Sequence, residues 1–132
     1  MTLFDCAYQG FATGDLDNDV RAIRLFVSRG LELFVCQSFS KNLGLYGERT
    51  GCVSVVCASP EHAARVQSQL KIIVRAMYSN PPIHGARIAA RVLNDPVLFN
   101  EWYAAVSSRS LHLVVLSSAH REVVSGLESS RS

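Results

Sequence analysis

The side chains of this sequence that could take part in chemistry lie in polar segments that follow apolar ones. Asp5 and Tyr8 form a D-x-x-Y pattern just after the apolar residues 1–4, and Lys41 lies in the polar stretch SFSKN that follows LELFVC. Ligand sites in open α/β sheets gather where strands end. A carboxylate, a phenol and an amine at such an edge could bind a polar ligand. Taken singly, each is more often a solvated loop side chain, so spacing alone assigns them no function.

The elements that must position these residues follow from the apolar pattern. Residues 1–4 and 31–36 predict two strands, and apolar residues at helical spacing between positions 20 and 27 predict a helix that begins at a cluster of aspartates and stops at Gly30. A strand, a helix and a second strand form a βαβ unit, which favours a parallel sheet. The predicted fold class is therefore α/β, with a mostly parallel sheet flanked by helices.

Further elements follow along the chain. Residues 37–50 are polar, contain two glycines and predict a loop, and residues 52–57 predict another strand. The run Ser-Pro-Glu at 59–61 is typical of a helix start, and this helix is expected to end near Tyr78. Two more helices are predicted, one from about Gly85 to Leu93 and one that begins at Asp95-Pro96.

Composition and charge exclude several classes of protein. The 132 residues are 48% hydrophobic and 18% charged, as expected for one globular domain. Basic and acidic residues are interspersed, with a net charge of +2, so nucleic-acid binding is not expected. No apolar run is long enough to span a bilayer, so no membrane partner is expected. The four cysteines form no C-x-x-C pair and the four histidines lack ligand spacing, so we expect no metal site and a reducing compartment.

Three segments taken together resemble one enzyme family. Residues 5–12 (DCAYQGFA), 36–49 (CQSFSKNLGLYGER) and 78–82 (YSNPP) are similar to motifs of the aspartate aminotransferases, in the same order. These are fold-type I enzymes that depend on pyridoxal 5′-phosphate (PLP). The resemblance implies that residues 1–106 are the second half of the large, PLP-binding domain, an incomplete part of that fold. Residues 107–132 are serine-rich, and we expect them to be a divergent tail that does not resemble the family.

The resemblance implies a role for each of three residues that contact the cofactor ring. Lys41 matches the lysine that forms a Schiff base with PLP and then moves a proton between the substrate and the cofactor. Asp5 matches the carboxylate that keeps the pyridine nitrogen protonated. Tyr8 matches the hydroxyl that donates to the phenolate oxygen. Lys41 is thus the expected catalytic residue, and all three are expected to bind the cofactor.

The resemblance also implies an anion site and a substrate site. Ser38 and Arg49 match ligands of the cofactor phosphate, for which a hydroxyl and a planar guanidinium are suited. Arg75 matches the arginine that enters the active site of the neighbouring subunit in a homodimer and binds the distal carboxylate of the substrate. Bidentate pairing of this kind selects dicarboxylic amino acids and 2-oxo acids.

The function implied is the exchange of an amino group between L-aspartate and 2-oxoglutarate, which gives oxaloacetate and L-glutamate. Two alternatives remain open. The chain could be a truncated, inactive product that at most associates with full-length subunits, because the family's α-carboxylate arginine and ring-stacking tryptophan have no counterpart here. An aromatic aminotransferase is the weaker alternative, because related enzymes share the lysine motif. We expect a cytoplasmic protein because no signal pattern is present, with a mitochondrial or other organellar form as the alternative.

Overall fold

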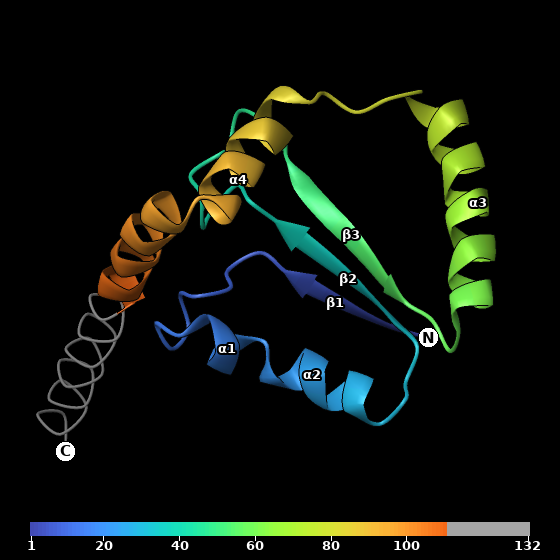
Figure 1. Ribbon diagram of the computed structural model, residues 1–132, viewed down its shortest axis with the longest axis horizontal. Coiled ribbons are helices and arrows are strands. Elements are labelled where there is room, and N and C mark those ends of the chain that lie inside the picture. The colour runs from blue at the N-terminus through green and yellow to red at the C-terminus, as the bar shows by residue number, and fades with distance from the viewer. Residues whose placement is uncertain (111–132) are drawn as a thin grey trace, which may run out of the picture.

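A three-stranded sheet lies at the centre of residues 1–110, the part of the chain that the computed structural model describes. Its strands are β1 (Thr2–Cys6), β2 (Leu33–Ser38) and β3 (Gly51–Val56), in the order β1-β2-β3. Figure 1 shows β2 between the other two. Most of the predicted tail lies outside the described residues.

The two strand pairs run in different directions. β1 and β2 are parallel, with Asp5 opposite Cys36, which confirms the predicted βαβ unit. β3 pairs antiparallel to β2, with Ser38 opposite Gly51. A side chain at Gly51 would lie 2.5 Å from the carbonyl oxygen of Gln37, so glycine is needed where the two strands meet. Because β2 and β3 are antiparallel, residues 39–50 connect the end of β2 to the start of β3 at the same end of the strands.

The segment between β1 and β2 forms two short helices where the sequence predicted one. Asp15 begins α1 (Leu16–Asp19), and its carboxylate accepts hydrogen bonds from the amides of Asp17 and Asn18. Val20 has φ −94° and ψ 1°, outside the helical region, and separates α1 from α2 (Arg21–Ser28). α2 ends at Ser28, and the predicted stop residue Gly30 follows with φ +72°.

α2 packs on the sheet through aromatic rings. The rings of Phe4 in β1 and Phe26 in α2 meet edge to face, with centroids 5.1 Å apart. Leu33, at the start of β2, is completely buried. The apolar residues of the βαβ unit therefore form the contact between helix and strand that their spacing predicted.

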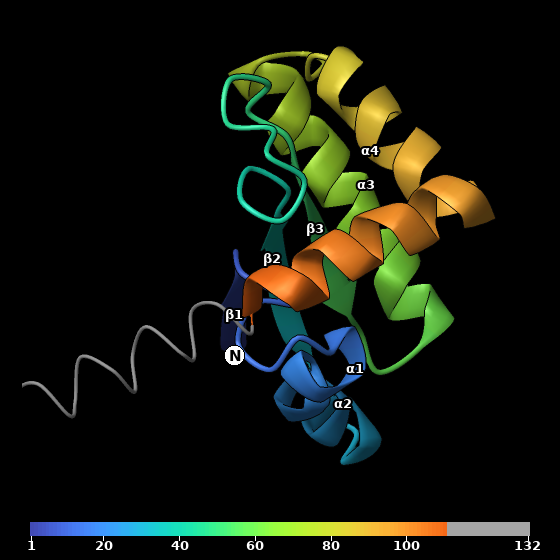
Figure 2. The same ribbon diagram turned by 90° about the vertical axis from the view of Figure 1, so that its left-hand side faces the viewer.

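Two of the remaining helices begin at the predicted caps. The Ser59 hydroxyl accepts from the amide of His62 at the start of α3 (Pro60–Met77), and α4 (His84–Asn94) follows. Asp95 then accepts from the amides of Val97 and Leu98, and residues 96–110 are helical. Figure 2 shows this last helix, in orange, lying across the ends of β1 and β2 between the loop of residues 39–50 and α1.

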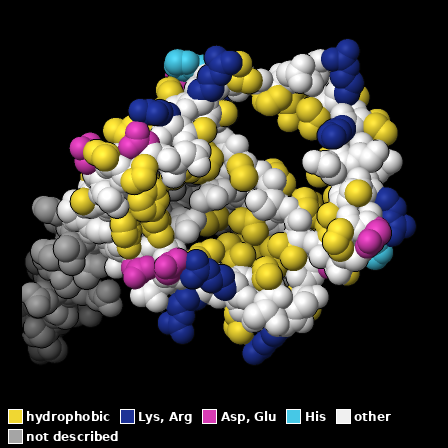
Figure 3. All heavy atoms as spheres, in the orientation of Figure 1, with side chains coloured by type: hydrophobic (Ala, Val, Ile, Leu, Met, Phe, Trp, Pro, Cys, Tyr) yellow, Lys and Arg dark blue, Asp and Glu magenta, His cyan; other side chains and the backbone are white. Residues whose placement is uncertain are grey.

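α3 lies beyond the β3 edge of the sheet and is separated from it by an open cleft. Residues of β3 and α3 line a hollow of about 510 Å³, and Figure 3 shows hydrophobic side chains around it. Val53 of β3 is 61% exposed, and Met77 near the end of α3 is 72% exposed. Within residues 1–110, no helix is both long and apolar enough to cross a membrane.

Candidate active site

Two loops meet at the carboxyl ends of β1 and β2. The Tyr8 loop, residues 7–14, follows β1, and the lysine loop, residues 39–50, follows β2. Because β1 and β2 are parallel, both loops leave the same edge of the sheet. Gln9 connects the two strand ends, since its Oε1 accepts from Nε2 of Gln37 at 2.7 Å and its own Nε2 donates to the carbonyl of Leu16 at 3.2 Å.

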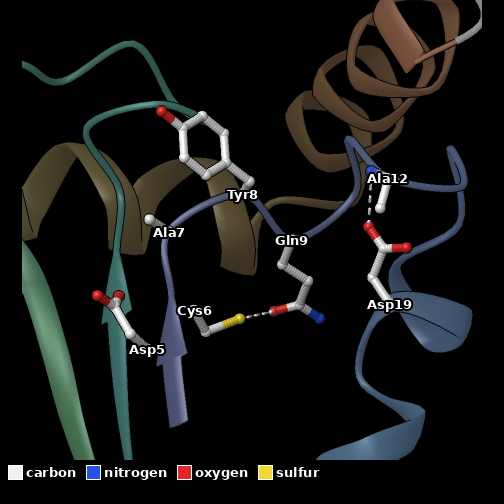
Figure 4. A pocket seen from close by; sticks show the side chains of 7 residues that line it. All are labelled: Asp5, Cys6, Ala7, Tyr8, Gln9, Ala12 and Asp19. Carbon is white, nitrogen blue, oxygen red and sulfur yellow. Dashed lines mark hydrogen bonds between the residues drawn. The ribbon is translucent and has the colours of Figure 1, made fainter. Parts of the chain in front are cut away.

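A pocket of about 400 Å³ opens beside the end of β1 (Figure 4). Its lining residues come from β1, the Tyr8 loop and α1: Asp5, Cys6, Ala7, Tyr8, Gln9, Ala12 and Asp19. Figure 4 shows the carboxylate of Asp5 and the sulfur of Cys6 on opposite sides of β1, because successive strand residues face opposite ways. Tyr8 is 60% exposed, so the pocket is open to solvent on its side.

Lys41 lies close to Tyr8. Its Nζ is 5.7 Å from the centroid of the Tyr8 ring, within the range of a cation–π contact. The neighbours of Lys41 in the chain, Ser40 and Asn42, are both buried. The backbone around Lys41 is folded into a turn, in which the amide of Gly44 donates to the carbonyl of Lys41 at 3.2 Å. The amine is therefore carried by a loop whose backbone is held on both sides.

The two expected phosphate ligands lie at opposite ends of the lysine loop. Ser38 is the last residue of β2, and its Oγ accepts from the amide of Ser40 at 3.2 Å. Arg49 is exposed, and its Nη1 donates to the carbonyl of Tyr46 at 3.3 Å. Arg49 has φ +50°, a conformation that residues other than glycine rarely adopt. Because Ser38 pairs with Gly51, the antiparallel sheet brings both ends of the loop to one edge.

Arg75 is not part of this cluster. It lies in the last turn of α3 and is exposed, with its guanidinium donating to the Ser79 hydroxyl. α3 lies on the far side of β3 from β1 (Figure 1), so Arg75 lies apart from the pocket. Of the other five predicted site residues, Asp5 and Tyr8 line the pocket and Lys41 lies beside Tyr8, while Ser38 and Arg49 lie at the two ends of the lysine loop.

Asp19 is the residue at this site whose role the sequence did not reveal. Its charge was expected to favour the start of a helix, but its carboxylate binds the Tyr8 loop instead. Asp19 accepts from the amides of Gly10 at 2.7 Å, Ala12 at 3.1 Å and Thr13 at 3.1 Å. It also accepts from the Thr13 hydroxyl at 2.7 Å. The only signal in the sequence is an aspartate placed shortly after a glycine-bearing loop, which many unrelated loops share.

The electrostatics of the pocket act on Cys6. Burial raises the pKa of the Cys6 thiol, and the nearby carboxylates of Asp19 and Asp5 raise this pKa further. Both effects disfavour the thiolate. Cys6 is therefore a neutral side chain at neutral pH, and a role as nucleophile does not fit its surroundings.

Comparison with known proteins identifies the family. The model of the family described as aminotransferase class I and II matches residues 1–122. The chain belongs to this family. The match reaches beyond residue 106, into the segment for which the sequence indicated no resemblance, and the position at which the resemblance ends stays a prediction.

Curated relatives in this family are aspartate aminotransferases. The mitochondrial aspartate aminotransferase P2 of Lupinus angustifolius is 65% identical over 99 residues, which are 75% of this chain and 22% of the relative. The cytoplasmic enzyme of Oryza sativa subsp. japonica is 58% identical over 102 residues, 77% of this chain and 25% of the relative. The chain thus spans about a quarter of the length of these relatives. Mitochondrial, cytoplasmic and chloroplastic forms all occur among them.

Solved structures of aminotransferases share the fold. An aromatic amino acid aminotransferase from Psychrobacter sp. B6, crystallised with aspartic acid, has a TM-score of 0.89 and 44% identity, covering 94% of this chain and 31% of that one. An aromatic-amino-acid aminotransferase from Burkholderia pseudomallei, covalently bound to PLP, has a TM-score of 0.81 and 44% identity, with coverage of 83% and 27%. The predicted fold class, part of a fold-type I aminotransferase, is therefore confirmed.

Proposed function

We propose that this chain supplies the lysine, the pyridine partner and part of the phosphate site of a PLP-dependent aspartate aminotransferase. The observation that carries the proposal is the arrangement at the ends of β1 and β2. There the Lys41 amine lies 5.7 Å from the Tyr8 ring centroid, and Tyr8 and Asp5 line one pocket. The proposed reaction transfers the amino group of L-aspartate to 2-oxoglutarate and yields oxaloacetate and L-glutamate.

The side chains at this edge of the sheet fit the chemical groups of PLP. A carboxylate, Asp5, suits a protonated pyridine nitrogen, a phenol, Tyr8, suits a phenolate oxygen, and a primary amine, Lys41, suits an aldehyde. When bound, PLP supplies an electron-poor ring that stabilises negative charge at the α-carbon of the substrate. The Ser38 hydroxyl and the Arg49 guanidinium, at the two ends of the lysine loop, suit a phosphate dianion.

The residues of this chain would act in three ways. Asp5 holds a proton on its partner nitrogen by charge pairing. Tyr8 orients the ring oxygen by donating a hydrogen bond. The Lys41 amine takes the proton from the α-carbon of the substrate and returns a proton on the cofactor side, which requires that the amine be held within reach of both atoms.

Arg75 supports a dicarboxylate substrate and a homodimer. Its guanidinium is exposed near the end of α3, apart from the pocket of its own chain. This position suits an arginine that reaches a neighbouring subunit, where it would pair with the distal carboxylate of aspartate or glutamate. A cytoplasmic location is part of the same proposal, with the organellar forms among the relatives as its alternatives.

The position of the reactive amine can be tested on the 132-residue chain. Lys41 and Lys71 are the two lysines of the sequence, and Lys71 is exposed on α3, so it is an internal control. Reduction with borohydride in the presence of PLP, followed by peptide mapping, is expected to label Lys41 in preference to Lys71. The preference should disappear in urea. Equal labelling of both lysines in the folded chain, or a preference for Lys71, would overturn the proposal.

The second candidate function is a chain that binds other subunits without turning over substrate. The exposed apolar side chains of α3 favour it, because Ile72, Ile73 and Met77 are each more than half exposed. A coupled assay of the chain with aspartate, 2-oxoglutarate and PLP tests this second candidate. We expect no turnover above that of free PLP, because the pocket is open to water beside Tyr8. Faster turnover would exclude the non-catalytic candidate.

A further inference from the structure

The helix of residues 96–110 contacts both loops of the site. The indole Nε1 of Trp102 donates to the backbone carbonyl of Asn42 at 2.7 Å, one residue after Lys41. Five residues further along the same helix, the Ser107 hydroxyl donates to the carbonyl of Gly14 at 2.7 Å. Figure 2 shows the helix between the lysine loop and α1.

The contact with the lysine loop acts on its backbone. Asn42 is 6% exposed, and within residues 1–110 its buried Oδ1 has no hydrogen-bond donor. The side chain of Asn42 therefore adds no polar anchor, and the hydrogen bond from Trp102 holds the main chain beside Lys41. Trp102 also packs against Phe99, with ring centroids 5.5 Å apart, so its indole is itself held in place on the helix.

The contact with the Tyr8 loop is a close fit. Val106 is 3% exposed, and a side chain at Gly10 would lie 2.6 Å from its Cγ1. The backbone of the Tyr8 loop therefore passes close to Val106, and the φ of +94° at Gly10 is a second reason why glycine is suited to this position. The helix thus fixes the Tyr8 loop through Val106 and Ser107 and the lysine loop through Trp102.

Resting on the proposed function of Lys41, we propose that the 96–110 helix is a brace that sets the lysine loop against the Tyr8 loop, with Trp102 as a positioning residue. Trp102 does not touch the reacting atoms. It limits the movement of the backbone that carries the Lys41 amine, so that the amine stays beside Tyr8. Proton transfer to and from a carbon atom depends on such placement.

The variant Trp102→Phe tests the brace because it removes the indole N–H and keeps an aromatic ring beside Phe99. Hydrogen exchange of the 132-residue chain is expected to become faster at residues 39–45, by roughly fivefold for the loss of one hydrogen bond of about 1 kcal/mol. Exchange in β1, β2 and α3 should not change. The ratio of PLP labelling at Lys41 to that at Lys71, measured by borohydride trapping, should fall by a similar factor.

Tyr103→Phe is the matched control. Tyr103 is the next residue on the helix, packs on Phe99 with centroids 6.0 Å apart, and makes no hydrogen bond to either loop within residues 1–110. We expect wild-type exchange and labelling in this variant. If Trp102→Phe fails to fold, Ser107→Ala provides the second test, with faster exchange expected in residues 10–14 alone.

The outcomes separate this inference from the proposed function. Unchanged exchange at residues 39–45 in Trp102→Phe would overturn the brace. Faster exchange with an unchanged labelling ratio would overturn the positioning role of Trp102. Absence of a Lys41 preference in the wild-type chain would overturn the proposed function, while the exchange data would still decide whether the brace exists.

Discussion

The carboxylate of Asp19 accepts a 2.7 Å hydrogen bond from the backbone amide of Gly10, nine positions earlier in the chain. With its other three hydrogen bonds, it accepts from three backbone amides and one hydroxyl of the Tyr8 loop in all. We predict that Asp19→Asn destabilises the chain by about 1–3 kcal/mol, because a charged acceptor of several amides is lost. Urea unfolding measures this change.

Asp17→Asn is the control for this prediction. Asp17 is exposed and pairs with Arg24 at 2.6 Å on the surface of α1 and α2. Surface pairs of this kind contribute little, so a change within about 0.5 kcal/mol is expected. Equal effects of the two substitutions would show that Asp19 is no more than a surface charge.

Gly10→Ala should destabilise the chain more than Gly30→Ala. Both glycines have positive φ, which costs an alanine about 1–2 kcal/mol. A Cβ at Gly30 meets nothing within 4 Å, whereas at Gly10 it meets Val106 at 2.6 Å, and such overpacking adds about 1–3 kcal/mol. Thermal or urea unfolding of both variants gives the comparison. The second substitution Val106→Ala should recover part of the loss in Gly10→Ala and none in Gly30→Ala.

The sequence predicts that the Tyr8 loop and the lysine loop are loops, but it does not predict the contacts that hold them in place. The caps at Ser59 and Asp95 are local signals that involve only the next few amides, and the structure confirms both. The contacts Trp102–Asn42 and Ser107–Gly14 join residues 60 and 93 positions apart. No local pattern encodes such pairs, since they depend on where the whole chain places the last helix.

The pairing direction of β3 is likewise not encoded by a local pattern. The apolar residues 52–57 predict a strand, but an alternating apolar segment does not state which way it will pair. The site residues themselves were expected from the family resemblance, and the structure places Asp5 and Tyr8 in one pocket with Lys41 beside Tyr8. Arg75 lies apart because α3 lies beyond β3, a position consistent with the expectation that this arginine serves a neighbouring subunit.

The raised pKa of Cys6 predicts that its thiol reacts slowly with disulfide reagents and that the folded chain loses stability at high pH. At pH 8, a disulfide reagent should modify the exposed Cys52 before Cys6. Above the ordinary thiol pKa of about 8.5, the unfolded chain loses this proton while the folded chain retains it, so stability falls as pH rises. Urea midpoints at pH 8 and pH 10 should therefore differ more in the wild type than in Cys6→Ala. A pH dependence that is identical in both would contradict the assignment.

Arg49→Gly is expected to separate stability from cofactor binding. Glycine relieves the φ +50° backbone and should stabilise the chain by about 1 kcal/mol. The variant also loses the proposed phosphate ligand. Trapping at Lys41 should then no longer favour PLP over pyridoxal, which lacks the phosphate. A preserved preference for PLP would remove Arg49 from the phosphate site.

Arg75→Asp tests substrate choice in an intact subunit that carries this segment. The substitution replaces attraction to the distal carboxylate with repulsion, so kcat/KM for aspartate should fall by several orders of magnitude and that for alanine far less. Arg65→Asp, on an exposed turn earlier in α3, is the control and should leave both substrates unaffected. Equal losses for aspartate and alanine would assign Arg75 a structural role.

The distance along the chain between the helix of residues 96–110 and the loops it contacts has a consequence for synthesis. A ribosome releases the N-terminal residues first, and β1, β2 and β3 are complete once residue 56 has emerged. The two loops stay without their anchors until Trp102 and Ser107 follow. During that interval all three strands are outside the ribosome, while the proposed brace of the Lys41 amine is still missing. If Lys41 is the PLP lysine and the brace holds it, we expect a nascent chain to capture PLP only after residues 96–110 have left the exit tunnel.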